Sequence, residues 1–146
     1  MALKAKRFLL AAVLWTSPAL AATDIVMHRD SGCGCCEKWA AEVRAAFGRN
    51  VRIVDDANRV EVDRRLGVPA SLAGCHTAII DGMAFEGHVP IADMKRVLAA
   101  KPNGVRGLAV AGMPMGSPGM EIPGMQADHY NVVAFGAGRT FVYSRY

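Results

Sequence analysis

Three of the four cysteines in this chain lie within four residues, because residues 33–36 read Cys-Gly-Cys-Cys. The segment just before them, residues 24–28, has the alternation of a short strand, and residues 36–47 place Trp39 and Val43 on one helical face. The thiols are therefore expected where a strand turns into a helix, and free backbone N–H groups and the helix dipole stabilise a thiolate there. A thiolate is both the nucleophile of disulfide exchange and the soft ligand that copper(I) prefers.

The first 21 residues are expected to be a secretory signal that is cleaved from the mature protein. Lys4, Lys6 and Arg7 form a basic start. They precede an apolar run at residues 8–15, shorter than the roughly 20 residues that a membrane span needs, and a small-x-small cleavage site at 19–21. Cleavage would remove three of the 17 basic residues and none of the 13 acidic ones, leaving 14 basic and 13 acidic residues and a net charge of +1. The mature chain is thus not expected to bind nucleic acid or to span a membrane.

Export points to an oxidising compartment, which we expect to be a bacterial periplasm. Four cysteines there usually form two structural disulfides. Cys33, Cys35 and Cys36 are too close in sequence to join distant parts of a fold, so such stapling would rely mainly on a bond to Cys75. The crowding favours a reactive or metal-binding site, and a disulfide-stapled binding module remains the alternative.

The segments after residue 47 follow from hydrophobic periodicity and turn residues. Asp81-Gly82 is a two-residue hairpin signal, and Val60 and Leu66 are expected to face inward from a helix. With the first strand and helix, the order is β-α-β-α-β-β-α, an α/β fold with a mixed sheet, parallel crossovers and a closing hairpin. The expected later elements are strands at 51–54, 77–80 and 83–86 and helices at 57–66 and 91–100.

The composition changes near residue 104. Residues 105–127 are rich in Gly, Pro and Met and show no helix or strand period, so we expect a long Met-rich loop there. Residues 130–146 read as a C-terminal hairpin split by glycines. Residues 22–146 are therefore expected to form one domain that includes this loop and this hairpin.

The order of elements, with C-x-x-C at the first helix start, resembles thioredoxin. Residues 33–36 are similar to its Cys-Gly-Pro-Cys active site, with Cys35 in place of proline. Thioredoxins place a cis-proline followed by threonine opposite their cysteines, and the matching residues here are His76-Thr77, directly after Cys75. The resemblance implies that all four thiols converge. Loss of the proline and gain of two thiols favour a soft-metal pocket over a plain redox pair.

A closer resemblance covers nearly all of residues 22–146 and rests on five motifs. The chain is similar to the small periplasmic copper-resistance proteins of the CopG type. That resemblance implies a thioredoxin-like fold that binds several copper ions through its cysteines and takes part in copper redox interconversion during detoxification. The motifs are C-G-C-C-x-x-W at 33–39, L-G-V-P at 66–69, C-H-T at 75–77, E-G-H-V-P at 86–90 and G-M-P-x-G-S-P-G-M at 112–120.

The donor types favour copper independently of the resemblance. Thiolates select copper(I) and can bridge ions, so three or four of them in one pocket suit a cluster better than a single ion. Zinc is the alternative, since four thiolates in a tetrahedron form a common structural zinc site. Zinc ligands usually come from two separated C-x-x-C pairs, however, and the adjacent Cys35 and Cys36 fit a tetrahedron poorly.

Histidines and methionines supply further candidate ligands. His88 lies in the E-G-H-V-P motif and His76 adjoins Cys75; imidazole tolerates copper(II), so both would help a site hold two oxidation states. Met115 and Met120 lie in the loop, where no helix face needs filling, and their thioethers are soft ligands for copper(I). Capping or gap-filling roles are the alternatives for these four residues. The core, in contrast, is the expected place of Met27, Met83 and Met94.

Two functions of different classes follow from these observations. The first is a periplasmic copper-binding protein whose thiolate cluster interconverts Cu(I) and Cu(II), as a copper oxidoreductase would, or sequesters copper for other copper-handling or efflux proteins. Its metal ligands would be Cys33, Cys35, Cys36 and Cys75, helped by His88, His76, Met115 and Met120. The second is a thiol–disulfide oxidoreductase in which Cys33 is the nucleophile and Cys36 the resolving thiol.

Overall fold

The computed structural model describes residues 24–146, so the expected secretory signal lies outside the described residues. No helix in this part of the chain is both long and apolar enough to cross a membrane. In chain order the elements are β1 (Ile25–Arg29), α1 (Gly34–Phe47), β2 (Val51–Asp55), α2 (Arg59–Leu66), the 3-10 turn η1 (Ala70–Leu72), β3 (His76–Ile80), β4 (Met83–Glu86), α3 (Ile91–Ala100), β5 (Gly107–Ala109), β6 (Asn131–Gly136) and β7 (Arg139–Arg145).

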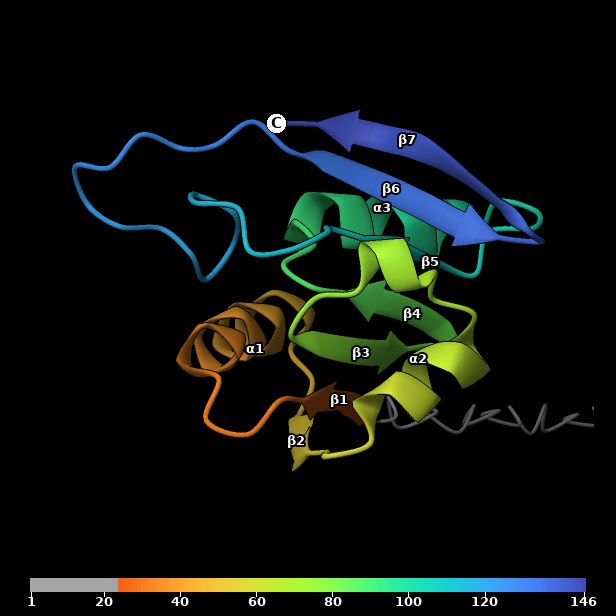
Figure 1. The fold of residues 1–146 in the computed structure, drawn as a ribbon, viewed down its shortest axis with the longest axis horizontal. Coiled ribbons are helices and arrows are strands. Elements are labelled where there is room, and N and C mark those ends of the chain that lie inside the picture. Colours follow the sequence, from red (N-terminus) through yellow and green to blue (C-terminus); the bar gives the residue numbers. More distant parts are fainter. Residues whose placement is uncertain (1–23) are drawn as a thin grey trace, which may run out of the picture.

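One mixed sheet runs through the whole domain in the order β2-β1-β3-β4-β5-β6-β7 (Figure 1). β1 and β2 are parallel because α1 carries the chain back between them, and β4 and β5 are parallel because α3 does the same. All other neighbours are antiparallel. The turn between β3 and β4 has positive φ at both Asp81 and Gly82, as a tight hairpin turn requires. The predicted mixed α/β fold of the thioredoxin type is confirmed.

Two apolar clusters lie on opposite faces of the sheet, because neighbouring residues of one strand point to opposite faces. Phe85 and Leu108 belong to the larger cluster, which α1 and α3 cover with Trp39 and other buried residues. Ala84 and Ala109 belong to the smaller cluster, on the side of α2 and η1. The larger cluster also holds Met27, Met83 and Met94, which confirms their predicted place in the core.

Strand β5 corrects the prediction that residues 105–127 contain no strand. Its three residues are too few to show a period of two, and glycine opens it. Gly107 is needed there: a Cβ at this position would lie 2.0 Å from the Ala84 carbonyl oxygen and 2.5 Å from the Phe135 ring. Through β5 the C-terminal hairpin, β6 and β7, joins the main sheet instead of forming a separate one.

Helix α2 corrects a second prediction. Val60 was expected to face inward but is 77% exposed, whereas Arg59 and Asp63 are buried beside Val62. The hydrophobic pattern misled because the inward face of this helix carries a charged pair that finds its partners inside the domain. The helix therefore brings charge, and not only apolar surface, under the loops that carry the cysteines.

Candidate metal centre

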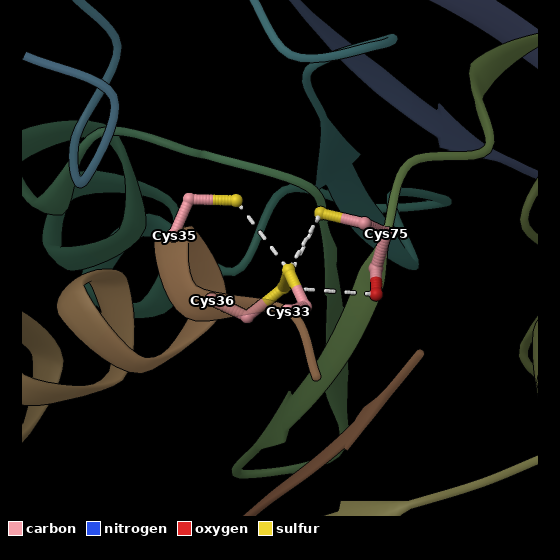
Figure 2. Close-up of side chains that lie close together, drawn as sticks. All are labelled: Cys33, Cys35, Cys36 and Cys75. Carbon is pink, nitrogen blue, oxygen red and sulfur yellow. Dashed lines mark hydrogen bonds between the residues drawn. A yellow bond between two sulfur atoms is a disulfide. The ribbon is translucent and has the colours of Figure 1, made fainter. Parts of the chain in front are cut away.

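The four cysteines meet at one end of the sheet (Figure 2). Cys33 is the N-terminal capping residue of α1, and Cys35 and Cys36 lie in the first turn of that helix. Cys75 directly precedes β3, and its Sγ lies 3.5 Å from the Sγ of Cys33 and 3.3 Å from that of Cys36. The Sγ of Cys35 is 3.4 Å from that of Cys33. The predicted convergence of four thiols is therefore confirmed, across a sequence separation of 42 residues between Cys33 and Cys75.

Strand pairing explains this convergence. β1 ends where β3 begins, because the antiparallel register pairs Arg29 with His76. The next residue in each direction is therefore also a neighbour, and the Asp30 N–H donates to the carbonyl oxygen of Cys75 at 3.0 Å. The loop that leaves β1 carries the cysteines of residues 33–36, and the loop that enters β3 carries Cys75. The sheet register thus brings the two segments together.

Cys33 and Cys36 are joined by a disulfide, while Cys35 and Cys75 are free. The alternative of a stapled module relied on a bond to Cys75 and on four oxidised cysteines, and neither is found. A bond across a separation of only three residues constrains the unfolded chain little. The disulfide is better understood as an oxidised state of the site than as a structural link.

Both candidate histidines are fully buried beside Cys75. The Sγ of Cys75 lies 3.6 Å from Nε2 of His88 and 3.8 Å from Nδ1 of His76, and the donor atoms of these three residues all lie within 4.8 Å of one another. The Pro118 carbonyl oxygen only accepts hydrogen bonds, so Nδ1 of His88, at 2.8 Å from it, carries the proton. Nε2 of His88 then keeps its lone pair on the side of Cys75.

The buried groups of the centre are held neutral. Burial, with His88 and Arg59 adding to it, lowers the pKa of His76 to about 3, and burial also lowers the pKa of His88. Burial and the neighbouring Cys35 raise the pKa of Cys75 to about 12. Among the described residues, Nε2 of His76 has no hydrogen-bond partner although it is buried. Neutral imidazoles can bind a metal ion directly, whereas the Cys75 thiol must lose its proton when it binds the ion.

Acidification is expected to destabilise the metal-free protein through His76. Its pKa in the folded chain is about 3 against an ordinary 6.5, so between these values the unfolded chain binds a proton that the folded chain does not. The contribution of His76 to the free energy of unfolding therefore falls as the pH decreases from about 6.5 towards 3. Thermal melts of the metal-free protein and of its His76→Asn variant, between about pH 7 and pH 5, should show the steeper loss in the parent protein.

Comparing the parent protein with the His76→Asn variant also cancels the effect of Glu86, whose contribution to stability changes with pH in the opposite direction. Burial raises the pKa of Glu86 from 4.5 to about 7, so its contribution to stability falls as the pH rises through that interval. Both proteins contain Glu86, and only the difference between them at each pH reports on His76. Equal slopes in the two proteins would show that His76 is not neutral in the folded chain.

Trp39 and the Met-rich loop close the centre. Trp39 is fully buried, its Nε1 donates to the Val89 carbonyl oxygen at 3.0 Å, and its ring lies 4.5 Å from that of His76. The helical face that was predicted to carry Trp39 and Val43 is therefore the buried one. The loop extends on the side of α1 (Figure 1). It reaches the centre at Pro118, which bonds His88, and at Gly119, which packs against the backbone of Cys35 and Trp39.

The candidate thioether ligands lie in the same loop. Met115 and Met120 are half-buried, whereas Met113 and Met125 are exposed. Met120 follows Gly119 directly, and the Met115 backbone is bonded at both its N–H and its carbonyl to Asp128. Metal contact by Met115 and Met120 stays a prediction, as does the ligand role of each cysteine and histidine.

Sequence reasoning missed a buried charged cluster behind the cysteines, made of Arg59, Asp63, Thr77 and Glu86. Its signals in the sequence were Thr77, which closes the C-H-T motif, and Glu86, which opens the E-G-H-V-P motif. The two α2 residues gave no signal, because a charged residue on a helix is ordinarily solvated.

This geometry defines the class: a thioredoxin-like protein with a four-cysteine cluster and two buried histidines. Residues 72–120 match a family described as "Protein of unknown function, DUF411". Two solved structures are similar over nearly their whole length, copper resistance protein CopG forms 1 and 2. Their TM-scores are 0.77 and 0.76 and their identities 42% and 43%, and the alignments cover 86% and 84% of this chain and 98% and 97% of theirs. No curated protein matches. The chain belongs to the CopG family of copper-resistance proteins.

Proposed function

We propose that this protein binds several copper ions in a thiolate cluster and interconverts Cu(I) and Cu(II), or sequesters copper, in copper resistance. One observation carries the proposal: the sulfur atoms of Cys33, Cys35, Cys36 and Cys75 lie within 4.8 Å of one another. Thiolates at that spacing can each bind more than one soft ion, and copper(I) is the ion that they select. The names of the similar structures point the same way.

The donor set also supports redox interconversion. Cys75 belongs to the group of four thiols and to the group that it forms with His76 and His88. The sulfur group suits copper(I), and the imidazoles tolerate copper(II). One site that offers both can hold either oxidation state while an electron passes to or from a partner. Sequestration uses the same ligands without the electron, and zinc is the alternative occupant.

Oxidation of the thiols opposes metal binding. The Cys33–Cys36 disulfide removes two thiolates from the donor set. The metal-binding form therefore has this bond reduced. We propose that residues 1–21 direct the chain to the periplasm, that residues 22–146 form the metal-binding domain there, and that other copper-handling or efflux proteins exchange copper with it.

Metal content and free thiols, measured on protein that is kept reduced, test the copper function. We expect more than one copper ion per chain and thiols that react only after a chelator is added. The Cys35→Ser variant should bind fewer copper ions, because a cluster of several ions needs Cys35 as one of its bridging ligands. Full copper content in that variant, or zinc in place of copper in the parent protein, would contradict the proposal.

A second function, thiol–disulfide exchange, is favoured by the disulfide itself. Cys33 is partly exposed and Cys36 is fully buried, as expected for an attacking and a resolving thiol. Turnover of a disulfide substrate by the metal-free protein, together with a low pKa of Cys33, would support this function. Turnover that needs neither Cys35 nor copper would make thiol–disulfide exchange the main function of the protein.

A further inference from the structure

One buried guanidinium touches both segments that carry the cysteines. Arg59, on α2, donates from Nε to Oδ1 of Asp30 at 3.1 Å and from NH2 to the carbonyl oxygen of Gly74. Asp30 is the first residue after β1 and opens the loop that leads to Cys33. Gly74 directly precedes Cys75. A single side chain from a third element thus links the two halves of the thiol cluster without touching a sulfur atom.

Glu86 holds the backbone of Gly74 from the other side. This carboxylate is fully buried, and its Oε1 accepts from the Gly74 N–H at 2.5 Å and from NH1 of Arg59 at 3.2 Å. Arg59 therefore bonds the carbonyl of Gly74 while Glu86 bonds its amide. The segment has no strand partner at this residue, so these two side chains supply the bonds that strand pairing supplies further on.

Close packing completes the restraint. A Cβ at Gly74 would lie 3.1 Å from the Cα of Gly87, so the two backbones are in contact. On the far side of Cys75, the Gly87 N–H donates to the His76 carbonyl at 2.8 Å. Any shift of Gly74 therefore moves Cys75 relative to the disulfide pair.

We propose that Arg59 and Glu86 are positioning residues that set the spacing between Cys75 and the cysteines of residues 33–36. A buried ion pair is often no more stabilising than apolar residues of the same volume, so stability alone gives little reason for it. Geometry gives one, since a metal site needs its ligands held within about 0.5 Å of the productive arrangement. The consequence for copper rests on the proposed function, whereas the spacing itself does not.

The spacing is testable without metal. In a reduced background with Cys35→Ser and Cys36→Ser, a mild oxidant joins Cys33 to Cys75, whose sulfur atoms lie 3.5 Å apart. Arg59→Lys keeps the charge but can reach only one of the two segments, and the bond should form roughly tenfold more slowly, because the effective concentration of one thiol at the other falls. Gly74→Ala should slow it as well, without changing any charge.

Asp63→Asn is the matched control. Asp63 accepts from Arg59 and from Thr77 but contacts neither Asp30 nor Gly74 in the described hydrogen bonds. It should lower the melting temperature of the metal-free protein and leave the rate of bond formation unchanged. Parent rates in both Arg59→Lys and Gly74→Ala would overturn the proposal. An equal slowing by Asp63→Asn would also overturn the proposal, because the buried charged residues would then affect the thiols only through the stability of the fold.

The copper content of the variants distinguishes the positioning proposal from the proposed copper function. With Cys35 and Cys36 restored, Arg59→Lys should hold fewer copper ions per folded chain than Asp63→Asn. A parent protein that binds no copper would end the copper function, and the oxidation rates would still decide the spacing. Parent copper content in Arg59→Lys would overturn the link from spacing to copper.

Discussion

Under the proposed function, replacement of Cys75 by serine is expected to remove most of the copper from the reduced protein. Its sulfur lies in both donor groups, with the three cysteines of residues 33–36 and with the two buried histidines. Loss of a residue that only orients a ligand costs about 10–100-fold in metal affinity, so loss of this shared ligand should cost more than roughly 100-fold. Serine has nearly the volume of cysteine, and its hydroxyl is a poor ligand for copper(I).

The measurement is copper per chain after dialysis against a weak chelator, with the melting temperature of the metal-free form as a check on folding. Met125→Ser is the control, because it removes a soft sulfur atom that is exposed in the Met-rich loop. It should keep the copper content of the parent protein. A Cys75→Ser variant that is folded and retains the full copper content would exclude a cluster built around this residue.

Gly119→Ala should open the centre to solvent. Gly119 has a φ of +81°, and a Cβ there would lie 2.8 Å from the Cys35 carbonyl oxygen and 2.9 Å from the Trp39 nitrogen. The loop must lift away from the start of α1 to make room, which breaks the bond between Pro118 and His88. Overpacking of this kind costs about 1–3 kcal/mol of folding free energy. The larger effect should be kinetic, with faster alkylation of Cys35 and faster copper loss.

Gly124→Ala is a close control for this variant. Gly124 lies in the same loop with the same φ of +81°, but a Cβ there would meet nothing within 4 Å among the described residues. Both variants share the strain of a left-handed backbone, and only Gly119→Ala has the clash. The rate of transfer of copper(I) to a strong chelator should rise in Gly119→Ala alone. Equal rates in both would show that the loop does not cover the site.

The parts of this fold that were predictable depend on local signals. The cysteines at a strand-to-helix junction, the Asp81-Gly82 turn and the order of strands and α-helices from β1 to α3 all follow from nearby residues. Convergence of Cys75 with the other thiols needed a resemblance, since no local pattern shows which loops face each other. The role of His76 and His88 was open for the same reason: their burial depends on Trp39 and on the loop at Pro118.

The predictions that were wrong concern segments whose structure depends on distant partners. β5 is a strand because β4 and β6 flank it, and three residues carry too little pattern to predict that. α2 turns Val60 outward because Arg59 and Asp63 find partners in β3, in β4 and in the loop at Gly74. Hydrophobic periodicity assumes that charge faces water, and a satisfied buried network breaks that assumption.

The sheet register has a consequence for the life of the protein in the cell. Cys75 meets the other thiols only when β1 and β3 are paired, so an unfolded chain offers copper only the three neighbouring thiols of residues 33–36, without Cys75. Under the proposed function, copper binds the folded chain far better and shifts the equilibrium towards it by mass action. Proteases degrade the unfolded fraction, so scarce copper should shorten the half-life of the protein and abundant copper should lengthen it. The amount of protein would then follow the metal without any change in synthesis.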